Sequence, residues 1–383
     1  MKHLLFLAAL VSLCISAKQL QAAELSGDCC ADLEERVKEL EAAGAPKGNQ
    51  KVSLSDDKGA LFNIPYYINY ETKTIVFFDP KASVFSYESA AFADLTSAIN
   101  GVVHDRLASN SPPNRLWAVA FGGVRDDENG DLGYGGVISG FDAPMTPSSR
   151  GGFFGGWSVS ELKAHGGSHD LETDYAFAGL YARTALSNSF ADFLIVGGRS
   201  ENDSERRIFN TRTPGVPEFA QGGYEGYFIN PEILMGSRQT LWGRTLTPSV
   251  SLGYAGLFLD ELNEKGSIAS VSLEQRDIHL LLSKAQVQLE EKWTDAGAIW
   301  RVKGNIGVSA RENVGEEKTK SVLGGVTGFD LNTGDDNAIA AFAGANISYS
   351  PAPSFEVFMA GEASIETEDA TSYTGRAGAS VKF

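Results

Sequence analysis

The chain has 383 residues, of which 42 are glycine, and its formal net charge at pH 7 is −17. A surplus of acid this large disfavours nucleic acid as a partner, because phosphate binding requires a cationic surface. The many glycines, together with 22 Phe and 12 Tyr, are typical of a fold with many strands, tight turns and aromatic belts.

The first 23 residues have the pattern of a secretory signal peptide. Lys2 and His3 precede an apolar run over residues 4–17, and the small residues Ala22 and Ala23 follow it. This run suits the apolar region of a signal peptide and is too short to cross a bilayer as a helix. No later stretch holds about 18 uninterrupted apolar residues, which excludes a helical membrane protein.

Residues 24–44 are predicted to form a short coiled-coil helix. The positions at heptad spacing are Cys30, Leu33, Val37 and Leu40. This pattern is typical of helices that associate with copies of themselves, although fewer than two heptads are marginal alone. Because Cys29 and Cys30 are adjacent, free thiols and intermolecular pairing both stay open.

Residues 45–84 are predicted to hold a linker and a β-hairpin. Glycine, proline and asparagine over 44–50 indicate the linker, and β-rich stretches on both sides of Glu71 indicate a hairpin within 63–79. This segment is either a minimal exported passenger or a stub that stays behind.

Residues 85–112 are predicted to hold a helix over 86–107. Apolar residues recur there at helical spacing, at Phe92, Leu95, Ile99, Val102, Val103 and Leu107. The stripe either packs against the hairpin or belongs to a helix at or in the mouth of a barrel. His104, which is next to Asp105 on this helix, is interpreted as making a local contact rather than acting as a catalytic base.

Residues 113–383 are predicted to form a barrel. We expect twelve strands, near 115–124, 132–142, 151–162, 174–186, 189–200, 222–236, 245–259, 277–292, 297–311, 337–350, 353–366 and 371–383. An even number of strands returns both ends of the barrel to the same side of the membrane. The predicted fold class is therefore all-β, a 12-stranded antiparallel transmembrane barrel preceded by a short α-helical, coiled-coil and hairpin region.

The predicted connections are of two kinds. Short turns are expected at 186–189, 294–297 and 351–353, and long acidic segments at 201–221, 260–277, 312–336 and 366–371. Short periplasmic turns and long external loops are the arrangement of outer-membrane barrels. We expect the acids of the long segments, among them Glu201, Asp203 and Glu205, to be solvated loop residues.

The last strand shows the alternation of a membrane barrel with a wet lumen. Tyr373, Val381 and the terminal Phe383 share one face with small residues, whereas Arg376 and Lys382 lie on the other. A further set of charges is predicted to point into the lumen, namely Arg301, Lys303, Arg311, Glu356 and Glu362. We expect these cations and acids to pair there, since an Arg or Lys at the lipid midplane costs about 2–4 kcal/mol.

Enzyme activity and cofactor binding are not expected. The sequence has no G-x-S-x-G motif, and no nucleophile, histidine and acid have a spacing that suggests a catalytic set. His165 and His169, close to Glu172, are weak metal candidates that we interpret as solvated loop residues. The prediction is therefore no metal, no cofactor and no enzyme.

Residues 85–383 resemble the C-terminal translocator, or β-domain, of the autotransporter family of type V secretion. The likeness lies in the helix, in the final aromatic residue and in four segments, 114–123, 133–142, 150–157 and 246–254. It implies a 12-stranded outer-membrane barrel, embedded in lipid and threaded by the preceding helix, which exports an N-terminal passenger. The barrel-assembly machinery is the implied reader of a C-terminal signal at Arg376, Gly378, Val381 and Phe383.

The sequence departs from that family where a passenger would lie. About 60 residues, from Glu24 to Lys81, are available, with no repeat that suggests a β-solenoid. The heptad segment also resembles, weakly, the coiled-coil stub of some trimeric porins.

Three functions remain open: an autotransporter-type barrel that displays a very small segment, a porin-like or structural barrel with a periplasmic oligomerising stub, and an outer-membrane enzyme. The helix favours the first and the lumen charges favour the second, and our prediction is the first.

Overall fold

The computed structural model describes residues 51–55, 61–69, 74–77, 83–109, 115–127, 130–164, 167–208, 217–316, 318–325, 327–332, 337–367 and 369–382. The predicted signal peptide, the heptad positions Cys30, Leu33, Val37 and Leu40, the candidate His165 and the terminal Phe383 lie outside these residues.

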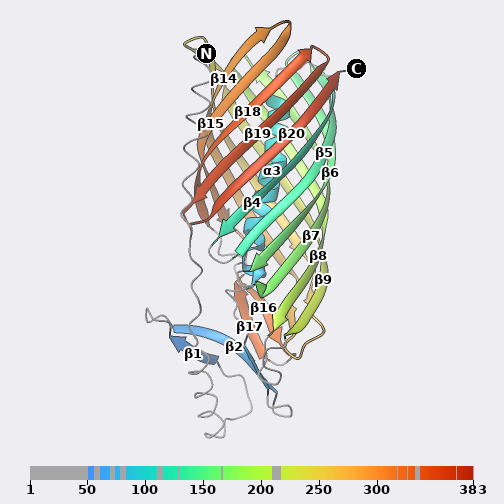
Figure 1. Cartoon of the computed structure of the whole chain (residues 1–383), viewed down its shortest axis with the longest axis vertical. Helices are drawn as coiled ribbons and strands as arrows, with labels where there is room; N and C mark the ends of the chain where they lie inside the picture. The colour runs from blue at the N-terminus through green and yellow to red at the C-terminus, as the bar shows by residue number, and fades with distance from the viewer. Residues whose placement is uncertain are drawn as a thin grey trace. The chain divides into compact units, whose positions relative to one another are not determined.

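Twelve antiparallel strands close into a barrel, as the sequence predicts. They are β4 (Arg115–Asp127), β5 (Gly130–Thr146), β6 (Ser149–Ala164), β7 (His169–Leu186), β8 (Ser189–Ile208), β9 (Glu218–Ser237), β11 (Arg244–Leu259), β14 (Arg276–Asp295), β15 (Ala298–Asn313), β18 (Ala338–Ala352), β19 (Phe355–Glu366) and β20 (Thr371–Lys382). A short β10 (Gln239–Leu241) continues β9 in its hairpin with β11. The last strand pairs with the first along its whole length, from Thr371 opposite Asp126 to Lys382 opposite Arg115. Figure 1 shows the tilted strands around the enclosed helix α3.

Alternation along each strand sorts side chains between the two faces of the wall. In β4, Trp117, Val119 and Phe121 are buried, whereas Leu116 and Val124 are exposed. Large buried residues of this kind line the lumen along β4 to β9, and exposed apolar residues face outward. The wall is therefore apolar outside, as a barrel in a bilayer requires.

The strands β8 and β9 run further than the sequence predicts. Glu201, Asp203 and Glu205, expected in a loop, belong to β8, which pairs with β9 up to Ile208. Because a ladder of backbone hydrogen bonds is satisfied in water as well as in lipid, polar strand ends can extend beyond the membrane. The prediction of a loop from 201 onward is wrong for this reason.

Two of the long connections also form a sheet instead of irregular loops. The strands β12 (Leu262–Asn263), β13 (Val271–Leu273), β16 (Lys318–Leu323) and β17 (Thr327–Asn332) pair in that order. We call this four-stranded unit the cap sheet. Its apolar residues Leu262, Val271, Leu323 and Leu331 are fully buried and belong to the same hydrophobic cluster as the start of the helix.

Before the helix, β1 (Lys51–Ser55), β2 (Leu61–Asn69) and β3 (Thr74–Phe77) form an antiparallel sheet in that order. The pair β2 and β3 occupies the region in which the sequence predicts a hairpin.

Helix α3 (Glu88–Ala108) follows a short 3₁₀ turn, η1 (Val84–Ser86). Glu88 lies in its first turn, where a negative charge complements the helix dipole, and Ser109 ends it in an extended conformation. Its buried residues are distributed around the helix rather than along one stripe, as expected for a helix enclosed by protein. No helix in the described residues has the length and apolar character needed to span a membrane.

Candidate functional site: the helix in the barrel lumen

The first turn of α3 is fixed where the long connections meet the barrel. Arg276, at the start of β14, donates to Glu88 Oε2 at 2.7 Å, and Tyr224 of β9 donates to Glu88 Oε1 at 2.7 Å. Just before the helix, the ring of Phe85 meets His169 edge-on at 4.7 Å. The helix therefore starts at the long-loop end of the barrel.

The middle of α3 bonds to carboxylates on β8 and β9. The side chain of Asn100 donates to Asn230 Oδ1 at 2.9 Å and also to Glu232. His104 lies between two acids, with Nε2 2.8 Å from Glu232 and Nδ1 3.3 Å from Asp192. The nearest partner of His104 is thus across the lumen rather than its neighbour on the helix.

The opposite side of α3 faces the joint between the first and last strands. Arg376 of β20 donates from Nε to Asp105 Oδ2 at 2.6 Å. On the first strand of this joint, Arg125 of β4 lies 3.6 Å from Asp94 of the helix and 2.7 Å from Glu366. Both strands of the joint therefore place a guanidinium against an acid of the helix.

The last turn of α3 is held by one arginine of its own and by two arginines of the barrel wall near the short turns. Arg106 pairs with Asp142 of β5 at 2.7 Å, and this aspartate is completely buried. The guanidinium groups of Arg150 and Arg183 both donate to the carbonyl of Leu107. Cations at the last carbonyls satisfy acceptors that a helix end leaves free and complement its dipole. The helix therefore ends at the short-turn end.

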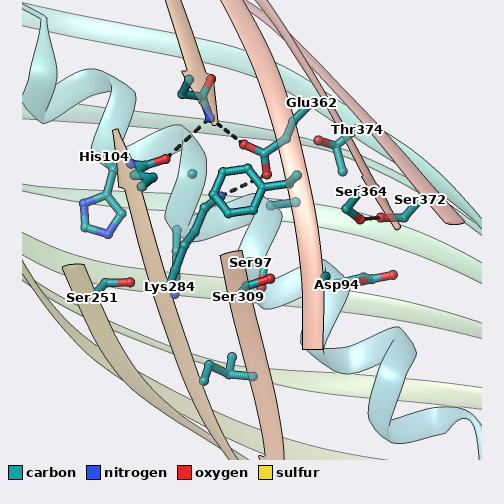
Figure 2. Close-up of a pocket in the computed structure, with 18 of the residues that line it drawn as sticks. Asp94, Ser97, His104, Ser251, Lys284, Ser309, Glu362, Ser364, Ser372 and Thr374 are labelled. Atoms are coloured by element: carbon teal, nitrogen blue, oxygen red, sulfur yellow. Dashed lines mark hydrogen bonds and ion pairs between the residues drawn. The ribbon is translucent and has the colours of Figure 1, made fainter. Parts of the chain in front are cut away.

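Large aromatic side chains are concentrated in the lumen on one side of the helix. From β4 to β9 they pack on the helix, as Phe92 does on Phe228 at 5.6 Å between ring centroids. On the other side, β11 to β20 contribute mostly Ser, Ala, Asn and Gln, and a cavity of about 190 Å³ remains between them and the helix. Figure 2 shows Ser97 and Asp94 of α3 facing Ser309, Ser364 and Thr374 of the wall.

The predicted lumen charges face inward, with partly different partners from those expected. Arg301 pairs with Glu356 at 3.3 Å, as expected. Lys303 instead approaches Glu290 at 3.9 Å, and Arg311 pairs with Glu366 at 3.2 Å.

Glu362 binds Lys284 at 2.9 Å and accepts from Asn305 at 3.1 Å, across the cavity wall (Figure 2). Glu362 thus pairs with a cation of β14 that the sequence did not predict.

The residues of the predicted assembly signal lie on both faces of β20. Arg376 points to the helix, whereas Val381 is on the exposed outer face. Gly378 leaves no room for a side chain, since a Cβ there would lie 2.7 Å from the carbonyl oxygen of Ala118. Recognition of these residues by the assembly machinery stays a prediction.

His169 is not the solvated loop residue that the sequence suggests. It begins β7, is 1% exposed and has Nε2 2.9 Å from Ser204 Oγ. Within the described residues Nδ1 has no hydrogen-bond partner, so this Ser–His pair lacks the acid of a catalytic triad. The described residues also contain no group of three or more His, Cys, Asp or Glu placed to hold a metal ion.

Sequence reasoning missed the carboxylates that receive the helix, Asp142, Asp192 and Glu232. Each lies on the inward face of a strand whose outward neighbours are largely apolar, as Asp192 does beside the exposed Phe193. That alternation was the available signal, and it needed the strand register to be interpreted.

Comparison with known proteins gives a consistent result. The family model of the autotransporter β-domain matches residues 116–362. The translocator domain of the autotransporter NalP from Neisseria meningitidis is similar with a TM-score of 0.64 and 19% identity, over 78% of this chain and 99% of that one. The β-domain of the Bordetella autotransporter BrkA gives 0.54 and 13%, over 70% and 99%. No curated protein sequence shows a significant match.

Proposed function

We propose that this chain, which belongs to the autotransporter β-domain family, exports the segment before its helix and keeps α3 in the lumen when export ends. Members of the family form an outer-membrane barrel that translocates an N-terminal passenger. The part specific to this chain is the identity of the exported segment, which we take to end at Ser83.

The direction of α3 carries the proposal. Glu88 is bound by Tyr224 and Arg276, which flank the long connections, whereas the carbonyl of Leu107 is bound by Arg150 and Arg183 beside short turns. Long connections face outward in outer-membrane barrels and short turns face the periplasm. The chain that enters the helix therefore does so from the outer side.

The occupied lumen favours export of a segment, rather than free diffusion of solutes, as the role of the barrel. The helix and the side chains of β4 to β9 occupy one half of the lumen, and the cavity that remains has a volume of about 190 Å³. A polar cavity of this volume holds water. A porin-like function is disfavoured while the helix is in place.

An epitope tag placed after Gly48 tests the proposal on intact cells. We expect antibody and protease to reach the tag without permeabilising the outer membrane. A matched tag in the short turn at 296–297, on the periplasmic side, should be reached only after permeabilisation. If the Gly48 tag also required permeabilisation, the segment would be periplasmic and the proposal would be wrong.

Removal of a signal peptide over 1–23 belongs to the same proposal, because export must begin at the inner membrane. N-terminal sequencing of the outer-membrane form should start close to Glu24, and an intact Met1 would contradict it.

A further inference from the structure

We propose that Arg376 is a positioning residue that seats α3 in the lumen by recognising a glycine and an acid one helical turn apart, Gly101 and Asp105. The inference rests on the proposed function, because it concerns how the exported chain comes to rest. It assigns to Arg376 a role besides the predicted assembly signal.

The guanidinium of Arg376 lies against the helix backbone at Gly101. A Cβ built on Gly101 would be 2.7 Å from Arg376 Nη1 and 3.4 Å from Cζ. From this position Nε donates to Asp105 Oδ2 at 2.6 Å, and the two side chains are 18% and 14% exposed. A side chain at position 101 would therefore displace the guanidinium that binds Asp105.

The three atoms nearest to a Cβ built on Gly101 all belong to Arg376. A glycine in a helix interior costs about 1 kcal/mol relative to alanine. Its usual justification is the close approach of another group to the backbone, and the group that approaches here is Arg376.

The glycine–acid pair marks one position along the chain. Five glycines precede Arg115, namely Gly27, Gly44, Gly48, Gly59 and Gly101. Gly101 alone has an acid four residues later, at the spacing that puts both residues on one face of a helix. A chain moving through the lumen therefore presents the space and the charge to Arg376 together at a single register.

The position of α3 that Arg376 fixes also depends on closure of the barrel. Arg376 is in β20, opposite Phe121 of β4, so its position is fixed once the last strand pairs with the first. On the other side of that joint, Arg125 lies 3.6 Å from Asp94, a second acid of the helix. The helix consequently finds its complete set of partners in a closed barrel.

Disulfide formation between the helix and the wall measures seating directly. The reporter pair is Asn100→Cys with Asn230→Cys, in a chain whose native cysteines are replaced by serine. The native side chains are in contact, with Asn100 Nδ2 2.9 Å from Asn230 Oδ1, and neither of them contacts Arg376 in this hydrogen bond. The test variants Asp105→Ala and Gly101→Leu alter the helix and leave the last strand unchanged. Ser97→Ala, which faces the cavity on the same helix, is the matched control.

We expect both test variants to lower the ratio of cross-linked to free barrel about tenfold, the effect of losing a charge-assisted hydrogen bond. The control should leave this ratio unchanged. Arg376→Lys should retain more cross-linking than Arg376→Ala, because lysine keeps the positive charge. It should retain less than the native chain, because lysine lacks the planar guanidinium group. Heat-dependent electrophoretic mobility identifies the folded barrel in every sample, so that the ratio is taken on folded protein.

The outcomes separate the two proposals. Unchanged cross-linking in both helix variants, with the Gly48 tag still exposed on cells, would overturn the role of Arg376 and leave export intact. A masked tag together with cross-linking that depends on Asp105 would overturn export of the segment and leave the seat intact.

Discussion

At the scale of single residues, the barrel is organised by buried pairs of a carboxylate and a guanidinium. Asp142 with Arg106, and Glu264 with Arg206, have carboxylates that are fully buried as side chains. Such pairs add little net stability when compared with apolar substitutes, but removing one partner leaves an unpaired charge that costs about 3–5 kcal/mol. We therefore expect them to act mainly by excluding other arrangements of the helix and the cap sheet.

The cap sheet offers a test of this view. Glu264→Ala would remove the carboxylate that binds the Arg206 guanidinium, which also donates to the carbonyl of Ala269 at 2.6 Å. We expect residues 262–273 to be cleaved faster by protease added to intact cells, as followed by mass spectrometry of the fragments.

Glu205→Ala is the control for the cap sheet, since Glu205 is an exposed acid of the neighbouring strand β8 bonded to Gln221. Equal cleavage rates in the two variants would show that the buried pair does not hold the cap sheet.

At the scale of elements, α3 meets two unlike walls. Most of its aromatic partners come from β4–β9, whereas the β11–β20 side has a larger share of small and polar residues and leaves the cavity. The helix is therefore the element that separates a packed half-lumen from a hydrated one.

Deleting residues 84–108 should convert the barrel into an open pore. The exposed lining would include Lys284, Glu362 and Asn305, which are polar groups that water solvates readily. Single-channel recordings in planar bilayers should show a conductance several-fold above that of the full chain. Deletion of residues 51–77, which keeps the helix, should leave the conductance unchanged, and equal values for all three proteins would contradict the prediction.

The elements also show where sequence reasoning succeeds and where it stops. Hydrophobic periodicity is a local property. A period of two predicts all twelve barrel strands, and a helical period predicts the helix over 86–107. The cap sheet was not predicted, because it pairs Val271 with Leu323, which belong to two separate connections. The partner of His104, Glu232, and the partner of Glu88, Arg276, were not predicted for the same reason. Each is more than a hundred positions away in the sequence.

At the scale of the whole molecule, the barrel must satisfy lipid outside and water inside across a wall one residue thick. Adjacent positions in β15 have opposite surroundings: Ile306 is 66% exposed on the outer face, and Asn305 bonds to Glu362 on the inner one. A charge should consequently be tolerated at one position and rejected at the next.

The pair Ile306→Lys and Asn305→Lys measures this asymmetry. The outward lysine should destabilise the folded barrel by about 2–4 kcal/mol, because it lies near the middle of its strand and therefore of the lipid band. The inward lysine gains Glu362 as a neighbour and should change stability little. Urea unfolding in lipid vesicles, followed by loss of the heat-modifiable band, provides the measurement. A similar loss in both variants would place the two residues in the same environment.

The spread of contacts along α3 has a mechanical consequence. Glu88 is bound at one end of the helix, Asn100 and Asp105 in its second half, and the carbonyl of Leu107 at the other end, each by a different part of the wall. A force that pulls the chain outward at Ser83, along the barrel axis, loads these bonds in parallel as shear, so that they fail together rather than one after another. Any tension applied to the segment before the helix is thereby distributed over the barrel, and the five residues that link Ser109 to Arg115 do not carry it alone.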